Sequence, residues 1–284
     1  MNVFHALMPI IALSMLAQPA AAQSTDPIPA PAPAPTPAPQ EEEEEEDRGF
    51  HGMTAVGLGA VPEYEGADRY RIIPLAYGRA YFDRRYVEFD GLAIRGNVLN
   101  SRRVEFGPVA HLTFGRRDKI DSAAVARLGR INDAYEIGAF VATTLPVGKN
   151  GEVRFALEGV HDVAQVHNGW IGTASVGYAH RFGERFRLTG TATLSGASDD
   201  YARRYFTVTP QESTASGLAA FNAKGGIKDV GITVGAAYKV TDRWSIVGFA
   251  GYKRLVGDFA RSPVVGREGS ANQLSGGLGV GFHF

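Results

Sequence analysis

The chain has 284 residues with 29 Lys or Arg, 30 Asp or Glu and no Cys, so disulfides and thiolate metal sites are excluded. Its formal charge of −1 is unevenly distributed, because every Lys and Arg lies at or after Arg48 and eight acids precede it. Residues 48–284 therefore carry 29 − 22 = +7. This charge weakly favours anionic lipid headgroups or wall polymers, and we predict no nucleic-acid partner.

Residues 1–22 are predicted to be a secretory signal peptide. Residues 6–17 are apolar, and residues 20–22 have the small-residue form that suits cleavage before Gln23. The apolar stretch is too short to span a bilayer as a helix. The segment that precedes it departs from the usual pattern, since it holds no Lys or Arg.

Residues 23–48 are predicted to be a disordered leader in the periplasm. Pro alternates with small residues over 27–39, which favours an extended polyproline II chain of about 40 Å. The acidic run Glu41 to Asp47 repels itself and should stay solvated. We interpret the leader as a solubilising spacer, with an acidic docking segment for a basic partner as the alternative.

Residues 49–284 are predicted to be a single barrel domain built from strands. They contain no extended apolar pattern of helical period and no run of eighteen apolar residues. Apolar and polar side chains alternate instead, as they do on the two faces of a strand. This alternation is present in residues 103–114, 152–158, 185–194 and 228–240.

The last thirteen residues, 272–284, show the alternation most clearly. Large apolar side chains occupy the even positions, and the chain ends on Phe, as outer-membrane barrels commonly do. We interpret the apolar faces as lipid-facing, and Phe282 and Phe284 as a signal for a BAM-type assembly machinery. Aromatic residues near strand ends, such as Tyr178, Phe182 and Trp244, fit interfacial girdles.

These patterns predict an all-β fold, a transmembrane antiparallel up-and-down β-barrel in the outer membrane with lipid as a partner. Short turns separate about ten strands from Tyr70 onward, and twelve result if residues 50–60 and 201–224 each supply one. We therefore predict ten to twelve strands, an even number being usual.

The inward faces are predicted to carry both signs of charge. Opposite charges in a narrow interior should pair, which favours a narrow or plugged lumen, with a selective channel as the alternative. The charged residues assigned to the lumen are Arg103, Glu105, Glu136, Arg154, Glu158, Arg185, Arg187, Asp229 and Lys239.

A series of short motifs is spread over residues 49–284. It comprises Pro62-Glu63-Tyr64-Glu65-Gly66 with Pro74, Gly107-Pro108, Asp199-Asp200-Tyr201 with Tyr205-Phe206-Thr207-Val208, Ser216-Gly217-Leu218, Asp242-Arg243-Trp244-Ser245, and Tyr252-Lys253-Arg254-Leu255-Val256-Gly257-Asp258 with Ser262-Pro263. In order and spacing the series resembles the MltA-interacting protein (MipA/OmpV) family of outer-membrane proteins. One turn departs from the family pattern: where Gly-Gly-His-Gly-Gly is frequent, residues 163–169 retain only His167 and Gly169.

The resemblance implies an outer-membrane barrel in a Gram-negative cell envelope. The founding member of the family is thought to be a scaffold that brings a lytic transglycosylase and a peptidoglycan synthase together. Relatives have been linked to adhesion, osmotic response, and antibiotic uptake or binding.

The longest stretch without alternation runs from about residue 198 to residue 226. Long loops carry function more often than short turns, and this one either folds inward to plug the barrel or presents an outer contact surface for a glycan or a protein. Its candidate contact residues are Asp199, Asp200, Tyr201, Arg203, Arg204, Tyr205 and Phe206.

An inward-facing His, Ser and acid grouping raises the possibility of a barrel hydrolase. His111, with Glu105 on the same face, and Ser275 with His283 are predicted to face inward. A shared face does not align a nucleophile with its base. We expect these histidines to make ordinary lumenal hydrogen bonds, and we predict no enzyme.

A second grouping, His161, Asp162 and His167, has a spacing that could contact a metal from a turn. No fourth ligand is apparent nearby in the sequence. We expect a solvated turn here, and neither a metal nor a cofactor is predicted.

The function we predict is that of a non-enzymatic scaffold for peptidoglycan-remodelling enzymes, with the leader reaching into the periplasm. The alternative is a narrow channel, or an uptake or adhesion protein for small solutes or a host surface.

Overall fold

The computed structural model describes residues 50–117 and 120–284. The expected signal peptide and leader, residues 1–22 and 23–48, lie outside this part. Among the described residues, no helix is long and apolar enough to cross a membrane.

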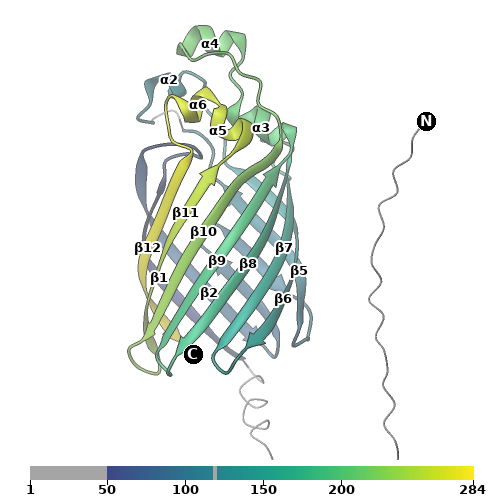
Figure 1. Cartoon of the computed structure of the whole chain (residues 1–284), viewed down its shortest axis with the longest axis vertical. Coiled ribbons are helices and arrows are strands. Elements are labelled where there is room, and N and C mark those ends of the chain that lie inside the picture. Colours follow the sequence, from purple (N-terminus) through teal and green to yellow (C-terminus); the bar gives the residue numbers. More distant parts are fainter. Residues whose placement is uncertain (1–49, 118–119) are drawn as a thin grey trace, which may run out of the picture. The chain divides into compact units, whose positions relative to one another are not determined.

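Twelve antiparallel strands close into one barrel, in which each strand pairs with its neighbours in sequence and β1 pairs with β12 (Figure 1). The predicted fold class and the upper limit of the predicted strand number are confirmed. The strands are β1 Phe50–Pro62, β2 Tyr70–Phe82, β3 Arg85–Asp90, β4 Ala93–Asn97, β5 Val104–Thr113, β6 Ala134–Val147, β7 Gly151–Asp162, β8 Trp170–Phe182, β9 Phe186–Ala197, β10 Gly226–Lys239, β11 Trp244–Leu255 and β12 Asn272–His283.

The prediction of a strand within residues 201–224 is wrong. This segment contains most of helix α3, Asp199–Phe206, and all of helix α4, Pro210–Ser216. A capping box between Thr209 and Glu212 stabilises the start of α4. Eleven strands rather than ten follow from Tyr70 onward, and they include β3 and β4, which form a short hairpin.

The outward faces of the strands are apolar. Leu278 on β12 is 72% exposed, and Leu58, which lies opposite it on β1, is 62% exposed. Leaving such side chains in water would be unfavourable, whereas lipid tails accommodate them. On the inward face of the same strand, Gln273 is buried. The predicted lipid-facing alternation is therefore confirmed.

Exposed aromatic side chains mark both ends of the strands, as expected for residues at a membrane interface. At the end that bears the C-terminus they are Phe50, Phe82, Tyr178, Phe182, Tyr238, Trp244 and Phe284, and at the other end Tyr70, Tyr135, Trp170 and Tyr252.

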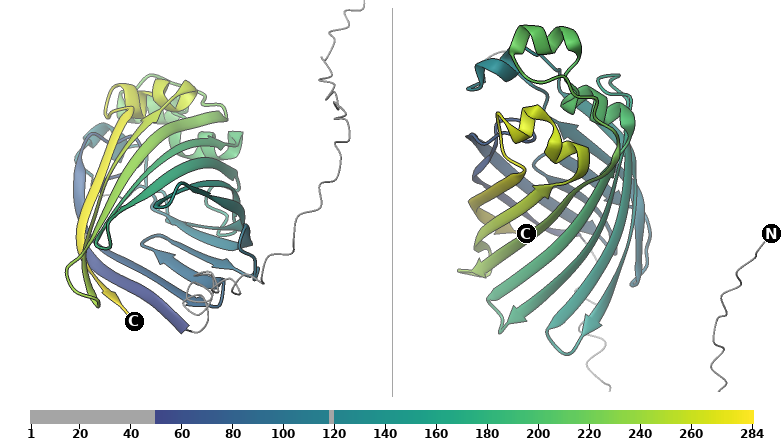
Figure 2. Two further views of the ribbon diagram at one scale, coloured as in Figure 1. Left: turned by 60° about the horizontal axis from the view of Figure 1, so that its bottom comes forward. Right: turned by 45° about the horizontal axis from the view of Figure 1, so that its top comes forward.

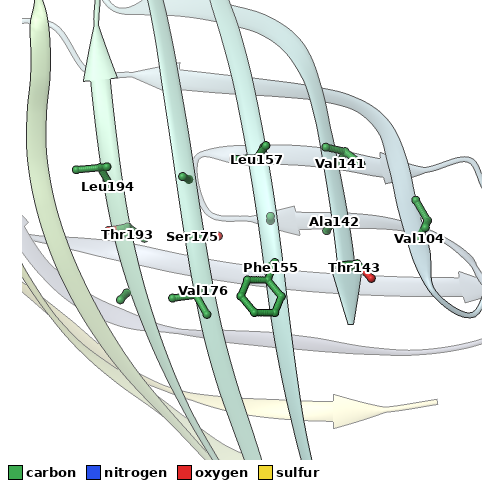
Figure 3. A pocket seen from close by; sticks show the side chains of 13 residues that line it. Val104, Val141, Ala142, Thr143, Phe155, Leu157, Ser175, Val176, Thr193 and Leu194 are labelled. Atoms are coloured by element: carbon green, nitrogen blue, oxygen red, sulfur yellow. The ribbon is translucent and has the colours of Figure 1, made fainter. Parts of the chain in front are cut away.

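A shallow apolar groove of about 560 Å³ lies on the wall formed by β5 to β9 (Figure 3). Val141, Phe155, Leu157 and Leu194 on its border are exposed apolar side chains of the outward face. Because the groove belongs to the lipid-facing wall, we assign it to contact with acyl chains.

The two ends of the barrel differ (Figures 1 and 2). The end near the C-terminus has short turns, such as residues 148–150 and 183–185. The other end carries α3 and α4 together with α2 Ala123–Ala126, α5 Gly257–Arg261 and α6 Pro263–Gly266. Outer-membrane barrels have short periplasmic turns and longer extracellular loops, so the helices belong to the extracellular end.

Candidate functional site

The loops at the helical end pack against one another into a structure that we call the loop cap. Tyr201, Phe206, Phe259 and Val265 form one buried cluster within it, together with Leu255 at the end of β11. A second cluster contains buried residues of the loops before β2, β6, β10 and β12. The loop cap consists of residues 63–69, 114–117, 120–133, 163–169, 198–225 and 256–271.

Helix α3 is fixed at its beginning by polar contacts with neighbouring segments. The Ser198 hydroxyl accepts a hydrogen bond from the Trp170 amide at 3.0 Å. Asp199 accepts one from the amide of Gly225 at 2.7 Å, which holds the two ends of the 198–225 loop together. Asp200 pairs with Arg203 on the exposed side of the helix.

The two faces of α3 separate the candidate contact residues that the sequence grouped together. Tyr201, Tyr205 and Phe206 are buried in the loop cap, whereas Arg203 and Arg204 are exposed. The aromatic residues therefore point into the protein, and the arginines face solvent.

Glu65, in the loop between β1 and β2, joins α3 to two strands. Its Oε2 accepts a hydrogen bond from the Tyr201 hydroxyl at 2.6 Å. Its Oε1 accepts from Lys228 Nζ at 2.8 Å and from Lys253 Nζ at 3.1 Å. Asp229 lies 3.4 Å from Lys228 and completes a balanced set of two cations and two anions. We call these five residues the Glu65 network.

The protonation states within the Glu65 network reinforce its contacts. Burial alone would raise the pKa of Glu65, but the ammonium groups of Lys228 and Lys253 outweigh burial and hold that pKa well below its usual range. Burial and the neighbouring carboxylate raise the pKa of Tyr201 well above its usual value. At neutral pH Glu65 is therefore an ionised acceptor and Tyr201 a protonated donor.

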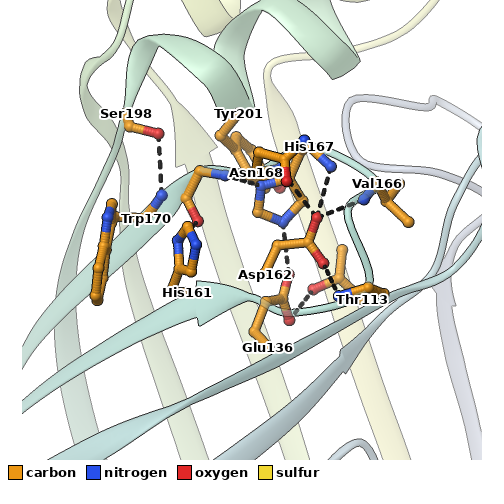
Figure 4. A network of polar contacts seen from close by, with 12 residues as sticks. Thr113, Glu136, His161, Asp162, Val166, His167, Asn168, Trp170, Ser198 and Tyr201 are labelled. Carbon is orange, nitrogen blue, oxygen red and sulfur yellow. Dashed lines mark hydrogen bonds and ion pairs between the residues drawn. The ribbon is translucent and has the colours of Figure 1, made fainter.

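A second polar cluster lies beside Tyr201, where β7 turns into β8 (Figure 4). The Gly169 amide donates to His167 Nδ1 at 3.0 Å, which leaves the ring proton on Nε2. Nε2 then donates to Glu136 at 3.2 Å, and the Thr113 hydroxyl donates to the other oxygen of Glu136 at 3.0 Å.

Asp162 organises the same turn by accepting hydrogen bonds from four backbone amides, those of Ala164, Val166, His167 and Asn168, at 2.6 to 3.0 Å. The expectation of a solvated turn is wrong, because Asp162 and His167 are buried. Burial is tolerated because their polar atoms are hydrogen-bonded, those of Asp162 within the turn and those of His167 to Gly169 of the turn and Glu136 of β6. Within the described ranges, no group of three or more His, Asp or Glu residues could hold a metal ion.

The strands β2 to β5, β7 and β9 carry charged side chains that pair inside the lumen. Arg79 lies 2.8 Å from Glu88, and Arg95 lies 3.3 Å from Glu88 and 3.7 Å from Glu158. His111 lies 3.1 Å from Glu158. Further pairs are Arg154 with Glu105 and Arg187 with Glu152. The predicted pairing of lumenal charges is confirmed for Glu105, Arg154, Glu158 and Arg187. We call all nine residues of these pairs the ion-pair ladder.

Arg103 and Arg185, which the alternation assigned to the lumen, lie in exposed turns just before β5 and β9, so this part of the prediction is wrong. The alternation fails there because both residues lie outside the strands, where the backbone no longer fixes which side a residue faces.

The residues considered for hydrolysis are not brought together. His283 Nε2 lies 3.1 Å from the hydroxyl of Ser245, and His111 is paired with Glu158. In the described part of the chain, neither histidine hydrogen-bonds to Ser275.

The Glu65 network unites segments that are distant in the sequence. Glu65, Tyr201 and Lys253 belong to three separate motifs of the series found in the sequence. The motif of Lys253 also supplies Ser262, whose hydroxyl donates to the carbonyl of Phe206, in the motif of Tyr201, at 2.6 Å. Sequence reasoning missed Glu65 and Lys228 as site residues. Glu65 could have been identified by its place in the motif Pro62-Glu63-Tyr64-Glu65-Gly66, whereas its residue type alone gave no signal.

The closed barrel with an apolar outer wall, aromatic girdles and long loops at one end defines an outer-membrane β-barrel protein. Residues 54–284 match the family described as MltA-interacting protein MipA. The chain belongs to this family.

Two curated proteins that resemble the chain are also outer-membrane proteins. The chain is 38% identical to outer membrane protein OmpV of Vibrio cholerae over 97 residues, which cover 34% of this chain and 36% of OmpV. It is 28% identical to putative outer membrane protein YiaT of Escherichia coli K12 over 116 residues, 40% of this chain and 46% of YiaT. The chain thus spans less than half the length of these relatives in the matched segments.

Two solved structures with similar barrels are an outer membrane channel from Pseudomonas putida F1 and the NanC porin. The first is 10% identical, with a TM-score of 0.44, and the match covers 84% of this chain and 96% of that one. NanC is 9% identical, with a TM-score of 0.40, and the match covers 82% and 99%.

Proposed function

We propose that the protein is a non-enzymatic scaffold that binds peptidoglycan-remodelling enzymes at the periplasmic end of the barrel. The observation that carries the proposal is the loop cap, in which Tyr201 and Phe206 are buried and Glu65 binds lysines of two strands. We propose that this cap plugs the outer mouth of the lumen. A plugged barrel is unsuited to free diffusion, which favours a function carried by its surface.

The proposed partners are a lytic transglycosylase and a peptidoglycan synthase. The family description, MltA-interacting protein, supports the first of these partners. The leader, residues 23–48, offers a spacer and an acidic run that complement a basic partner.

We also propose that a BAM-type assembly machinery recognises the last strand, β12, through Phe282 and Phe284. The Phe282 ring packs against Trp244, with ring centroids 5.1 Å apart. Phe284 exchanges two backbone hydrogen bonds with Gly52 of β1 and so helps to close the barrel, while its side chain is 46% exposed.

The test of scaffolding is a pull-down from envelope extract with the full chain and with a variant that lacks residues 23–47. We expect the full chain to recover a transglycosylase and a synthase, and the shortened chain to recover less of both. A matched control replaces Glu41–Glu46 by Gln, which keeps the length of the spacer and removes its charge. Recovery of neither enzyme with any of the three would refute the scaffold.

A narrow channel is the second candidate, because solvent reaches charged side chains inside the barrel. Glu152 and Arg187 are 42% and 41% exposed in their side chains, and Lys253 is 39% exposed. Planar-bilayer recordings separate the candidates. Reproducible ion-selective current steps from the unmodified protein would favour the channel. Absence of such current from that protein would favour the plugged barrel.

A further inference from the structure

The lumen has an apolar wall that faces the ion-pair ladder. A cavity of about 540 Å³ is lined there by β1, β2 and β9 to β12, with Leu75, Val247 and Phe249 among its apolar side chains. A side chain added at Gly277 would meet Leu75 at 2.5 Å and Phe249 at 2.8 Å, which places these three residues on one face. Phe249 is 38% exposed although it faces the interior of the barrel, so the wall is hollow at this point.

Glycine residues provide part of this space. Gly235 lies between Thr189 of β9 and Phe249 of β11 in the strand register. A Cβ atom at Gly235 would meet only a backbone oxygen, that of Gly248 at 3.9 Å. A larger side chain at this position would therefore project into the cavity beside Phe249.

The polar edge of the cavity has one unpaired charge. Asp90, Tyr77 and Arg187 line it, but Arg187 is paired with Glu152 and the Tyr77 hydroxyl donates to Glu88. In the described ranges, the Asp90 carboxylate has no hydrogen bond or ion pair. Glu88, which precedes Asp90 on β3, is itself paired with Arg79 and Arg95.

We propose that this cavity binds a small molecule in which one protonated amine is attached to a compact apolar body. The amine pairs with Asp90, and the apolar body packs on Phe249 and Leu75, where it replaces water. The volume is typical of small-molecule sites. Enclosure by the barrel wall excludes a folded protein as the occupant. This binding goes beyond the scaffold role and does not depend on it.

Three probes of one shape test the proposal: 1-adamantanamine, 1-adamantanol and 1-adamantanecarboxylate. Their affinities are measured by isothermal titration calorimetry on the purified barrel in detergent, with empty micelles as the blank. We expect the amine to bind about tenfold more tightly than the alcohol, and the carboxylate to bind most weakly. In Asp90→Asn the amine should bind no more tightly than the alcohol.

Gly235→Leu is expected to remove binding of all three probes by filling the cavity. Gly190→Leu is its matched control, because Gly190 faces outward on β9 and also has open space around its Cβ position. Phe249→Ala gives a further variant, which should weaken all three probes about fivefold through lost apolar contact. Folding of each variant is checked by circular dichroism and by its heat-dependent mobility in detergent gels.

Equal affinity of the three probes, or unchanged binding in Gly235→Leu, would overturn the proposal. A chain that binds the amine only after residues 23–49 are deleted would also overturn it, because the lumen would then hold the protein's own leader. Recovery or loss of cell-wall enzymes in the pull-down has no bearing on any of these outcomes, so the two proposals fail independently.

Discussion

At the scale of single residues, the side chain of Glu65 joins one helix of the loop cap to two strands of the barrel. One carboxylate accepts hydrogen bonds from α3, β10 and β11, and it neutralises Lys228, whose side chain is only 9% exposed. A buried ammonium without its partner is strongly unfavourable. The position of α3 over the barrel therefore depends on a charge contributed by a loop more than a hundred residues earlier in the chain.

Glu65→Gln is expected to loosen the loop cap and leave the barrel intact. The change keeps the shape of the side chain but leaves Lys228 and Lys253 with Asp229 alone, at a local cost of about 3 kcal/mol. Hydrogen exchange of residues 199–206, followed by mass spectrometry, should accelerate by about a hundredfold. Asp200→Asn is the control, because the exposed pair of Asp200 with Arg203 contributes little. Similar exchange in the two variants would contradict the role given to Glu65.

The same carboxyl predicts how the loop cap responds to acid. The pKa of Glu65 is lower in the folded cap than in an unfolded chain, so its contribution to stability is fully present above about pH 4.3. It is lost as the pH falls through the lower, folded pKa. The near-UV circular dichroism of the packed tyrosines should therefore stay constant from pH 7 to about pH 5 and decline only in stronger acid. Glu65→Gln should lack this acid transition, and a transition of equal size in that variant would assign it to another group.

At the scale of elements, the turn between β7 and β8 supports α3 from the side. The Asp162 carboxylate accepts hydrogen bonds from four backbone amides of the turn. The turn positions the ring of His167 against that of Tyr201, with ring centroids 4.9 Å apart. Gln165 and Asn168 both have positive φ, which the tight wrapping of the turn around Asp162 requires. The turn thus links the strands of the barrel to the packing of the helix.

Asp162→Ala should disorder this turn and release α3. Four amides would lose their acceptor, with an expected cost of about 3 kcal/mol in the stability of the loop cap. Limited trypsin digestion should then cleave after Arg203 and Arg204 faster than in the parent protein. Val163→Ala changes an exposed side chain of the same turn and should leave the digestion rate unchanged. Equal rates in the two variants would show that the turn does not hold α3.

Sequence alone predicted the strands of the barrel well and the loop cap poorly, and the physical reason is the range of the interactions. Alternation is a local pattern, so β10 and β12 are recognisable from their own residues. Helix α3 spans only eight residues, too few for a clear helical period. The contact between Glu65 and Lys253 joins residues 188 apart, which no local pattern encodes. Burial of His167 was missed because its partners come from β6 and from the turn itself.

At the scale of the whole molecule, three surfaces of the barrel have different chemistry. The outer wall is apolar and meets lipid, one side of the lumen carries the ion-pair ladder, and the other side is apolar with Phe249 exposed. A strand presents alternate residues to the two sides, so one strand can serve lipid and lumen at once. A charge should therefore be tolerated or rejected according to whether its position is odd or even within a strand.

Leu278→Arg tests this division on the last strand. Leu278 is 72% exposed on the outward face of β12, near the middle of the strand, where an arginine in lipid is expected to cost about 2–4 kcal/mol. Urea titration of the barrel refolded into phosphatidylcholine vesicles should show this loss of unfolding free energy. Ser275→Arg, on the inward face of the same strand, should lower stability by less, because the lumen admits water beside charged side chains such as Lys253. If the two arginines destabilised the barrel equally, the assignment of the outward face to lipid would be wrong.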